Sequence, residues 1–354
     1  SLDISNDISG NDASFNNIGS LKTISPEMVQ VGWKNWGETT LIETIATSIS
    51  PQGGSIVFND TGDTFAWLYG QNSSQTEPWN KVVVYKYDGN TWNQLGGDNM
   101  KPDQGYRSIS SIDINGSGNR VIMGCSGFEA AANGDDRSVG QVKVYEFDGS
   151  SWQILGGNGN ITGWANGPGS QGYPYGVKIG ASVSINYAGN VIAFSAPKED
   201  DNVNNHSGRI YVYYLNSSNT WQDTGGNANM RGDQETSNVG NYSNSISLNK
   251  EGNRIIFGSN NWAGGSGIKI YQWSGGTNFS SGNWGEVEAL YDTTIYNFGS
   301  AVSMNGTGDI VIIGCREFQG TDCRVEVRKK NGSNYDKLGS TLRGEDPPIS
   351  GSRF

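Results

Sequence analysis

The stretch VKVYEFDGSSWQILGG, residues 142–157, contains the signals of a β-hairpin. Val144 and Tyr145 favour a strand, Asp148-Gly149 is a turn pair, and Trp152 begins a second apolar run. Related stretches begin at Val82, Ile210, Ile268 and Val325. Five copies of one hairpin make this chain a repeat protein.

A second hairpin alternates with the first, as in SSIDINGSGNRVIMGC and ASVSINYAGNVIAFSA. Each copy places an asparagine, two residues and a glycine between two short apolar runs, and these glycines lie at positions 62, 118, 189, 252 and 308. One period is therefore four strands in 56 to 71 residues. A lone four-stranded sheet cannot bury both of its faces, so this period predicts the blades of an all-β propeller with almost no helix.

The two ends of the chain decide the number of blades. Five complete repeats run from about Ser55 to Gly339, and the stretch MVQVGWKNWGETTLIETIATSIS at 28–50 contains two or three further strand-like runs. A ring should leave no long open strand edge. We therefore predict six four-stranded antiparallel blades, the sixth built mainly from the N-terminal strands and clasped by the C-terminal tail, while five or seven remain open. The domains are a polar leader or stalk end at 1–20 and the propeller at 21–354.

The repeated motifs carry a resemblance to a known group of proteins. The pattern VxVYxxDGxxWxxLGG followed by SVSxNxxGNxxAxxxP resembles tandem β-propeller repeats of marine bacteria, algae and giant algal viruses, related to FG-GAP and kelch-like propellers. The leader DISGNDASFNN resembles short repeats in fibre-like proteins of large algal viruses. These motifs specify a blade and no chemistry. The resemblance implies an extracellular or virion-surface binding protein, and it names no ligand.

Charge and cysteine content limit the partners. The formal net charge is −11, with 35 acidic and 24 basic side chains and no basic stripe, so binding to nucleic acid or to an anionic membrane is disfavoured. No apolar run is long enough to insert into a membrane. Cys315 and Cys323 flank one hairpin loop at a spacing compatible with a disulfide, and the sequence does not decide whether this bond forms. Cys125 is predicted to be a core residue.

Loops that differ between repeats are the predicted binding face. In a blade of alternating strands, the short uniform turns emerge on one side of the disc and the long variable loops on the other, and variable loops on a rigid scaffold often carry binding. Aromatic rings in these loops could stack on sugars or anchor a protein. The candidate ligand-binding residues are Trp79, Trp164, Tyr173, Tyr175 and Trp262. The alternative for each ring is that it only holds its own loop.

Metal binding and catalysis have weaker signals. The acidic loop Glu199, Asp200 and Asp201 is the candidate Ca²⁺ site, against the alternative of a solvated loop; no other cofactor is expected. The chain has a single histidine, His206, and no nucleophile pattern around it, so no catalytic residue is assigned. We therefore predict a non-enzymatic adhesion module, a surface or virion fibre head that binds a glycan or protein receptor and other surface proteins. The alternatives are a structural or decorating subunit of a particle and a polysaccharide-acting enzyme.

Overall fold

A computed structural model describes the chain in segments: residues 55–70, 80–97, 100–103, 109–129, 138–164, 176–200, 206–225, 230–233, 237–262, 265–292, 297–315 and 324–343. Within these segments the regular elements are strands, arranged as five antiparallel sheets in chain order. We number the sheets as blades 1 to 5. The described residues contain no helix that is long and apolar enough to cross a membrane.

Each blade has four consecutive strands, and two blades carry one more. The strands are, for blade 1, β1 (Ile56–Phe58), β2 (Thr64–Gly70), β3 (Asn80–Tyr87) and β4 (Trp92–Gln94); for blade 2, β5 (Ser111–Ile114), β6 (Arg120–Cys125), β7 (Gln141–Phe147), β8 (Trp152–Ile154) and β9 (Asn160–Thr162); for blade 3, β10 (Val183–Ile185), β11 (Val191–Ala196), β12 (Arg209–Leu215) and β13 (Trp221–Asp223); for blade 4, β14 (Ile246–Leu248), β15 (Arg254–Trp262), β16 (Gly265–Trp273) and β17 (Trp284–Asp292); and for blade 5, β18 (Phe298–Met304), β19 (Ile310–Cys315), β20 (Arg324–Asn331), β21 (Asn334–Lys337) and β22 (Leu342–Arg343).

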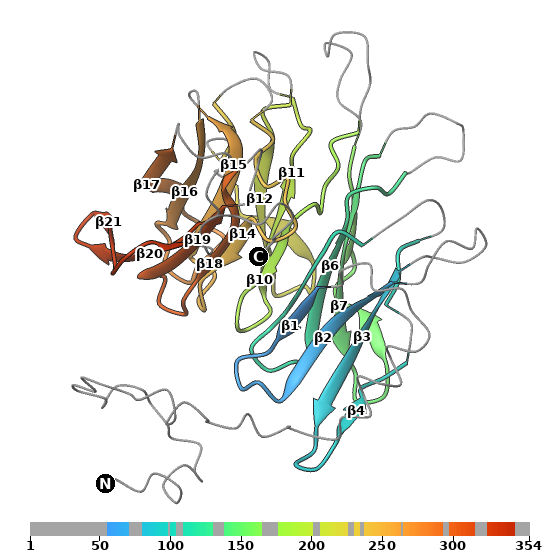
Figure 1. The fold of residues 1–354 in the computed structure, drawn as a ribbon. Helices are drawn as coiled ribbons and strands as arrows, with labels where there is room; N and C mark the ends of the chain where they lie inside the picture. The colour runs from blue at the N-terminus through green and yellow to red at the C-terminus, as the bar shows by residue number, and fades with distance from the viewer. Residues whose placement is uncertain are drawn as a thin grey trace, which may run out of the picture.

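The blades fan out around a common axis (Figure 1). The first strands contact one another in sequence, β1 with β5, β5 with β10, β10 with β14 and β14 with β18, so they line the axis. The later strands of each blade lie progressively farther out. This arrangement confirms the predicted all-β propeller of four-stranded antiparallel blades. It does not confirm six blades, because residues 1–54, including the leader at 1–20 and the strand-like runs at 28–50, lie outside the described residues.

The turn between the first two strands is the same in every blade. Its asparagine accepts hydrogen bonds from backbone N–H groups four or five residues later, as Asn186 Oδ1 does from Asn190 N (3.0 Å) and Val191 N (2.9 Å). Its glycine has a positive φ, 70° at Gly189, which other residues rarely adopt. Turn geometry therefore accounts for the recurring asparagine and glycine.

The hydrophobic core consists of layers between successive blades. One buried cluster joins blades 1 and 2, and others join blades 2 and 3, 3 and 4, and 4 and 5. Cys125 lies in the first of these layers with no exposed surface, which confirms that it is a core residue. A blade is therefore stable only when neighbouring blades cover its apolar faces, and this requires several copies of the repeat in one chain.

A tryptophan at the start of the fourth strand ties neighbouring blades together. The indole N–H of Trp152 donates to Leu95 O (2.8 Å), and that of Trp221 donates to Leu155 O (3.0 Å), in each case on the preceding blade. Both side chains are buried. These two tryptophans therefore pack between blades, as the repeat predicts.

Replacing Trp221 by phenylalanine is expected to lower the free energy of unfolding by about 1–3 kcal/mol, because the Leu155 carbonyl loses its indole donor in a buried layer. Urea unfolding followed by circular dichroism measures this. Trp164→Phe is the control, because Trp164 is 39% exposed and should change stability little. An equal loss in the two variants would contradict the assigned role of Trp221.

Candidate functional site

A cavity of about 440 Å³ lies at the axis of the propeller. Residues from all five first strands line it, and they include hydroxyl groups, an amide and aliphatic side chains. Its polar lining residues are Ser55, Asp113, Ser184, Ser243, Asn244, Ser247 and Ser303. Asp113 is the only ionisable side chain in this described lining.

Asp113 stands where the repeat otherwise has an uncharged residue. The position two residues before the turn asparagine is occupied in blades 1 to 5 by Val57, Asp113, Ser184, Ser247 and Ser303. A residue that follows the repeat is explained by blade construction. A residue that departs from it, in a cavity, calls for another explanation.

The serines at this position have a structural role. Ser184 Oγ accepts a hydrogen bond from Leu248 N (3.2 Å) of the next blade. Ser247 Oγ accepts one from Met304 N (3.1 Å) in the same way. Asp113 makes the equivalent bond, since its Oδ2 accepts from Ile185 N (2.9 Å). A hydroxyl is therefore sufficient to join two blades, and the negative charge of Asp113 is additional.

The carboxyl of Asp113 is held by neutral donors alone. Besides Ile185 N, it accepts from Ser184 Oγ (3.1 Å) and from Ile114 N (2.9 Å). No lysine or arginine of the described residues forms an ion pair with it or lowers its pKa. Burial in the wall of the axial cavity raises the pKa of Asp113 to about 6, and the three hydrogen bonds only partly oppose this increase. A carboxyl with this pKa can take up and release a proton near neutral pH.

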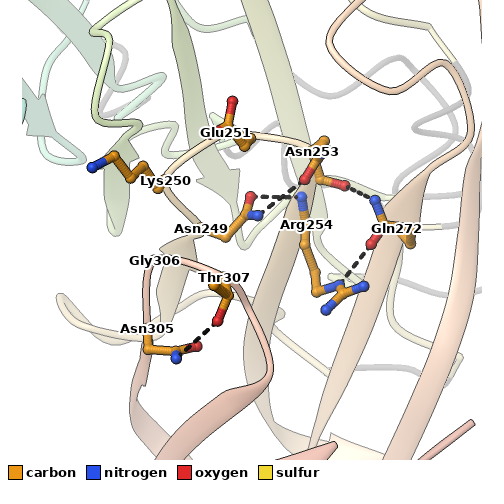
Figure 2. Close-up of a pocket in the computed structure, with 9 residues that line it drawn as sticks. All are labelled: Asn249, Lys250, Glu251, Asn253, Arg254, Gln272, Asn305, Gly306 and Thr307. Carbon is orange, nitrogen blue, oxygen red and sulfur yellow. Dashed lines mark hydrogen bonds between the residues drawn. The ribbon is translucent and has the colours of Figure 1, made fainter. Parts of the chain in front are cut away.

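A second cavity of about 560 Å³ lies on the turn side, between the turns of blades 4 and 5 (Figure 2). Arg254 crosses it, donating from Nε to Gln272 Oε1 (2.6 Å) and from Nη1 to Gly308 O (2.8 Å) of the next blade. Arg120 of blade 2 repeats this pattern, with bonds to Glu146 Oε1 (2.8 Å) and Gly189 O (3.1 Å). The repeat explains this groove, so we place the candidate site at the axis.

The predicted aromatic site is largely outside the described structure. Trp79, Tyr173 and Tyr175 lie outside the described residues, and of Trp262 only the backbone, in β15, is described. Trp164 is 39% exposed, and its ring meets Tyr211 edge-on with centroids 5.5 Å apart. The proposed ligand-binding role of these rings therefore stays a prediction.

Of the predicted metal residues, Glu199 lies in a buried polar cluster with Tyr211, whose ring meets that of Trp164. Glu199 accepts from Arg231 Nη2 (2.9 Å) and from Tyr211 Oη (2.7 Å), and Arg209 Nη1 lies 3.5 Å away. Two guanidinium groups therefore balance its charge. Asp200 Oδ1 accepts from His206 N (2.6 Å), and Asp201 lies outside the described residues.

No cluster of three or more metal-ligating acids, cysteines or histidines occurs in the part of the chain that the structure describes. The Ca²⁺ site thus stays a prediction, as do the predicted partners. Cys323 also lies outside the described residues, so its bond to Cys315 is untested.

Comparison with known proteins identifies no family. No protein-family model and no curated protein matches the sequence. Among solved structures, a putative TolB from Agrobacterium tumefaciens is 11% identical, covering 82% of this chain and 81% of its own, with a TM-score of 0.41. A periplasmic gluconolactonase from Pseudomonas aeruginosa is 9% identical over 80% of this chain and 70% of its own, with a TM-score of 0.47. The β-propeller domain of the Trilobed protease from Pyrococcus furiosus is 9% identical over 80% and 71%, with a TM-score of 0.42.

These comparisons correct the predicted function. The chain was expected to be a non-enzymatic adhesion module, whereas the solved structures that it resembles include a gluconolactonase and a propeller domain of a protease. Neither a virion nor a fibre is supported by them. One departure from the repeat has no place in that expectation: SSIDINGSGN carries an aspartate where ASVSINYAGN carries a serine.

Proposed function

We propose that the chain is an enzyme whose active site is the axial cavity, with Asp113 as the general base in hydrolysis of a small, uncharged, hydroxyl-bearing substrate derived from a carbohydrate. The observation that carries this proposal is the single carboxyl group at a position that is serine in three other blades. It lines a cavity of substrate size without a cationic partner among the described residues.

The lining supports this substrate class. Hydroxyl groups of Ser247 and Ser303 can bond to sugar hydroxyls, and Val183 and Ile246 provide apolar contacts for a ring. Glycosidases need a pair of carboxyl groups, and among the described residues this cavity offers only one. We therefore favour hydrolysis of an ester or lactone, in which one base suffices.

In this reaction the Asp113 carboxylate accepts a proton from a water molecule while the water oxygen attacks the acyl carbon. The bond to the alcohol oxygen then breaks, and the proton on Asp113 passes to that leaving oxygen. The carboxyl group returns to its starting state. We also propose a location outside the cytoplasm, supported by the weakly charged, asparagine- and serine-rich composition.

The test is hydrolysis of aldonolactones, acetylated sugars and nitrophenyl glycosides by the full chain. Asp113→Asn is expected to lower kcat/KM by about 100-fold or more, because removing a general base has effects of this order. In the unmodified chain kcat/KM should fall as pH drops through about 6, since the base must be ionised. Asp148→Asn, in an exposed turn, is the control. Equal activity of the Asp113→Asn variant, no hydrolysis of any lactone or acetylated sugar, or hydrolysis of the glycosides alone would contradict the proposal.

A further inference from the structure

Two apolar faces at the two ends of the blade series are exposed, although their counterparts elsewhere are buried. The leading face belongs to blade 1 and carries Ile56 and Phe58. The trailing face belongs to blade 5 and carries Ile312, Val325 and Val327. In every other pair of adjacent blades, a trailing face packs on the leading face of the next blade.

On the leading face, the exposed fraction of each residue in blade 1 can be compared with that of the equivalent residues in blades 2 to 5. Ile56 is 54% exposed and Phe58 is 55% exposed. The residues at the position of Ile56 in blades 2 to 5 are Ile112 at 3%, Val183 at 4%, Ile246 at 5% and Val302 at 8%. The residues at the position of Phe58 are Ile114 at 5%, Ile185 at 6%, Leu248 at 7% and Met304 at 8%. The same positions in the same fold are therefore buried wherever a preceding blade covers them.

On the trailing face of blade 5, apolar residues are likewise exposed where their counterparts in blades 1 to 4 are buried. Ile312 is 45% exposed, and Val325 and Val327 are only half-buried. The counterparts of Ile312 in blades 1 to 4 are Ala66, Ile122, Ala193 and Ile256, all fully buried at 0%. Exposed apolar surface of this kind is usually covered in the working molecule.

The two faces border the same space. Ile56 and Val57 of blade 1 and Ile312, Gly314 and Val325 of blade 5 all line the axial cavity. The two faces therefore bound a single gap between the last and the first blade, and this gap opens onto the axial cavity.

A relay of backbone hydrogen bonds between turns also starts and stops at this gap. Asp60 N donates to Gly116 O, Gly116 N to Tyr187 O, Tyr187 N to Lys250 O and Lys250 N to Gly306 O, at 2.9–3.3 Å. The donors and acceptors thus run from blade 1 to blade 5. One more turn, between Gly306 and Asp60, would make the relay circular.

We propose that residues 28–50 of the same chain form a sixth blade in this gap, packed between the trailing face of blade 5 and the leading face of blade 1. Residues 28–50 are 23 residues, fewer than the 39 from Ile56 to Gln94 that form blade 1, so the segment is long enough for two or three strands of the sixth blade. Val29, Val31 and Trp33 alternate with polar or small residues, as a strand covered on one face requires. Only five positions separate residue 50 from Ile56, the first residue of β1, so the segment can reach the leading face.

The test places a charge on each face and measures thermal unfolding of the full chain. Ile56→Glu and Ile312→Glu are expected to lower Tm by about 5 °C or more, because a carboxylate would enter a covered apolar layer. Ile154→Glu is the matched control, since Ile154 is an isoleucine of similar exposure, 41%, on the outer strand β8. Light scattering should find a monomer.

A double variant identifies the occupant. Val31→Glu alone should also lower Tm, and Val31→Glu combined with Ile312→Glu should lower it by clearly less than the sum, because both changes break the same contact. If Ile56→Glu and Ile312→Glu lowered Tm no more than Ile154→Glu does, the two faces would be exposed in the full chain, and the proposal would be overturned. Strict additivity, or a dimer whose Tm rises with concentration, would also overturn it, the dimer by showing that a second copy covers the faces.

Discussion

Replacing Asp113 by serine is expected to raise the free energy of unfolding by about 2 kcal/mol at pH 8, and to add little at about pH 3. The pKa of about 6 in the folded chain lies above 3.8, the ordinary pKa of an aspartate carboxyl. Between these two pH values the folded chain holds a proton that the unfolded chain has released. Wild-type stability therefore falls as pH rises through this window, and above it the buried charge is a constant penalty.

Serine removes this penalty while keeping the bond between blades. The chain itself shows that serine fits, because Ser184 and Ser247 accept backbone N–H bonds from their next blades at 3.2 and 3.1 Å. The measurement is urea unfolding of both proteins from about pH 3 to pH 8. A stability difference that is constant across this range would contradict the raised pKa.

Asp148 is the control, because its pKa is shifted in the direction opposite to that of Asp113. Backbone N–H groups of Ser151 and Ser150 hold the pKa of this exposed carboxyl below its usual range. Its contribution to stability is present above the unfolded pKa and is lost as pH falls through the folded pKa. Asp148→Ala should therefore be less stable than the wild type at pH 8, with the difference disappearing in acid. The two aspartates thus predict opposite pH dependences in one protein.

Replacing Gly258 by alanine is expected to lower the free energy of unfolding by about 3 kcal/mol. Gly258 is in β15 of blade 4, and a Cβ at this position would lie 1.9 Å from the carbonyl oxygen of Gly299 in blade 5. Backbone atoms on both sides leave no flexible side chain to move aside. The blades must therefore separate locally, which opens the layer around Ile256 and Val302.

Gly97→Ala is the control for this substitution, because a Cβ there has nothing within 4 Å. It should be neutral or slightly stabilising, through reduced freedom of the unfolded chain. Thermal unfolding compares the two variants directly. A small effect of Gly258→Ala would mean that adjacent blades tolerate separation, contrary to the close approach at this position.

How far the sequence predicts the structure depends on whether a residue belongs to the repeat. The turn asparagines, Trp152 and Trp221 recur at fixed positions, and their roles could be predicted because local turn geometry or blade packing requires the same residue each time. The candidate site could not be predicted in this way. Asp113 is a single departure within a repeated strand, and only the folded structure shows that its carboxyl lines a cavity with neutral donors around it.

The two exposed faces illustrate the same limit. Ile56 and Ile312 follow the repeat like any core residue, so the sequence predicts them to be buried. Only the burial of each position, compared blade by blade, shows that one layer is missing between the blades that the structure describes.

Four-stranded blades follow from the amino-acid pattern of this chain, because strand period, turn asparagines and turn glycines act over a few residues. Which residues meet at the axis, and which apolar faces lack a neighbour, can be read only from the folded chain. Both depend on contacts between residues more than fifty positions apart, and a repeated local pattern leaves these contacts unspecified.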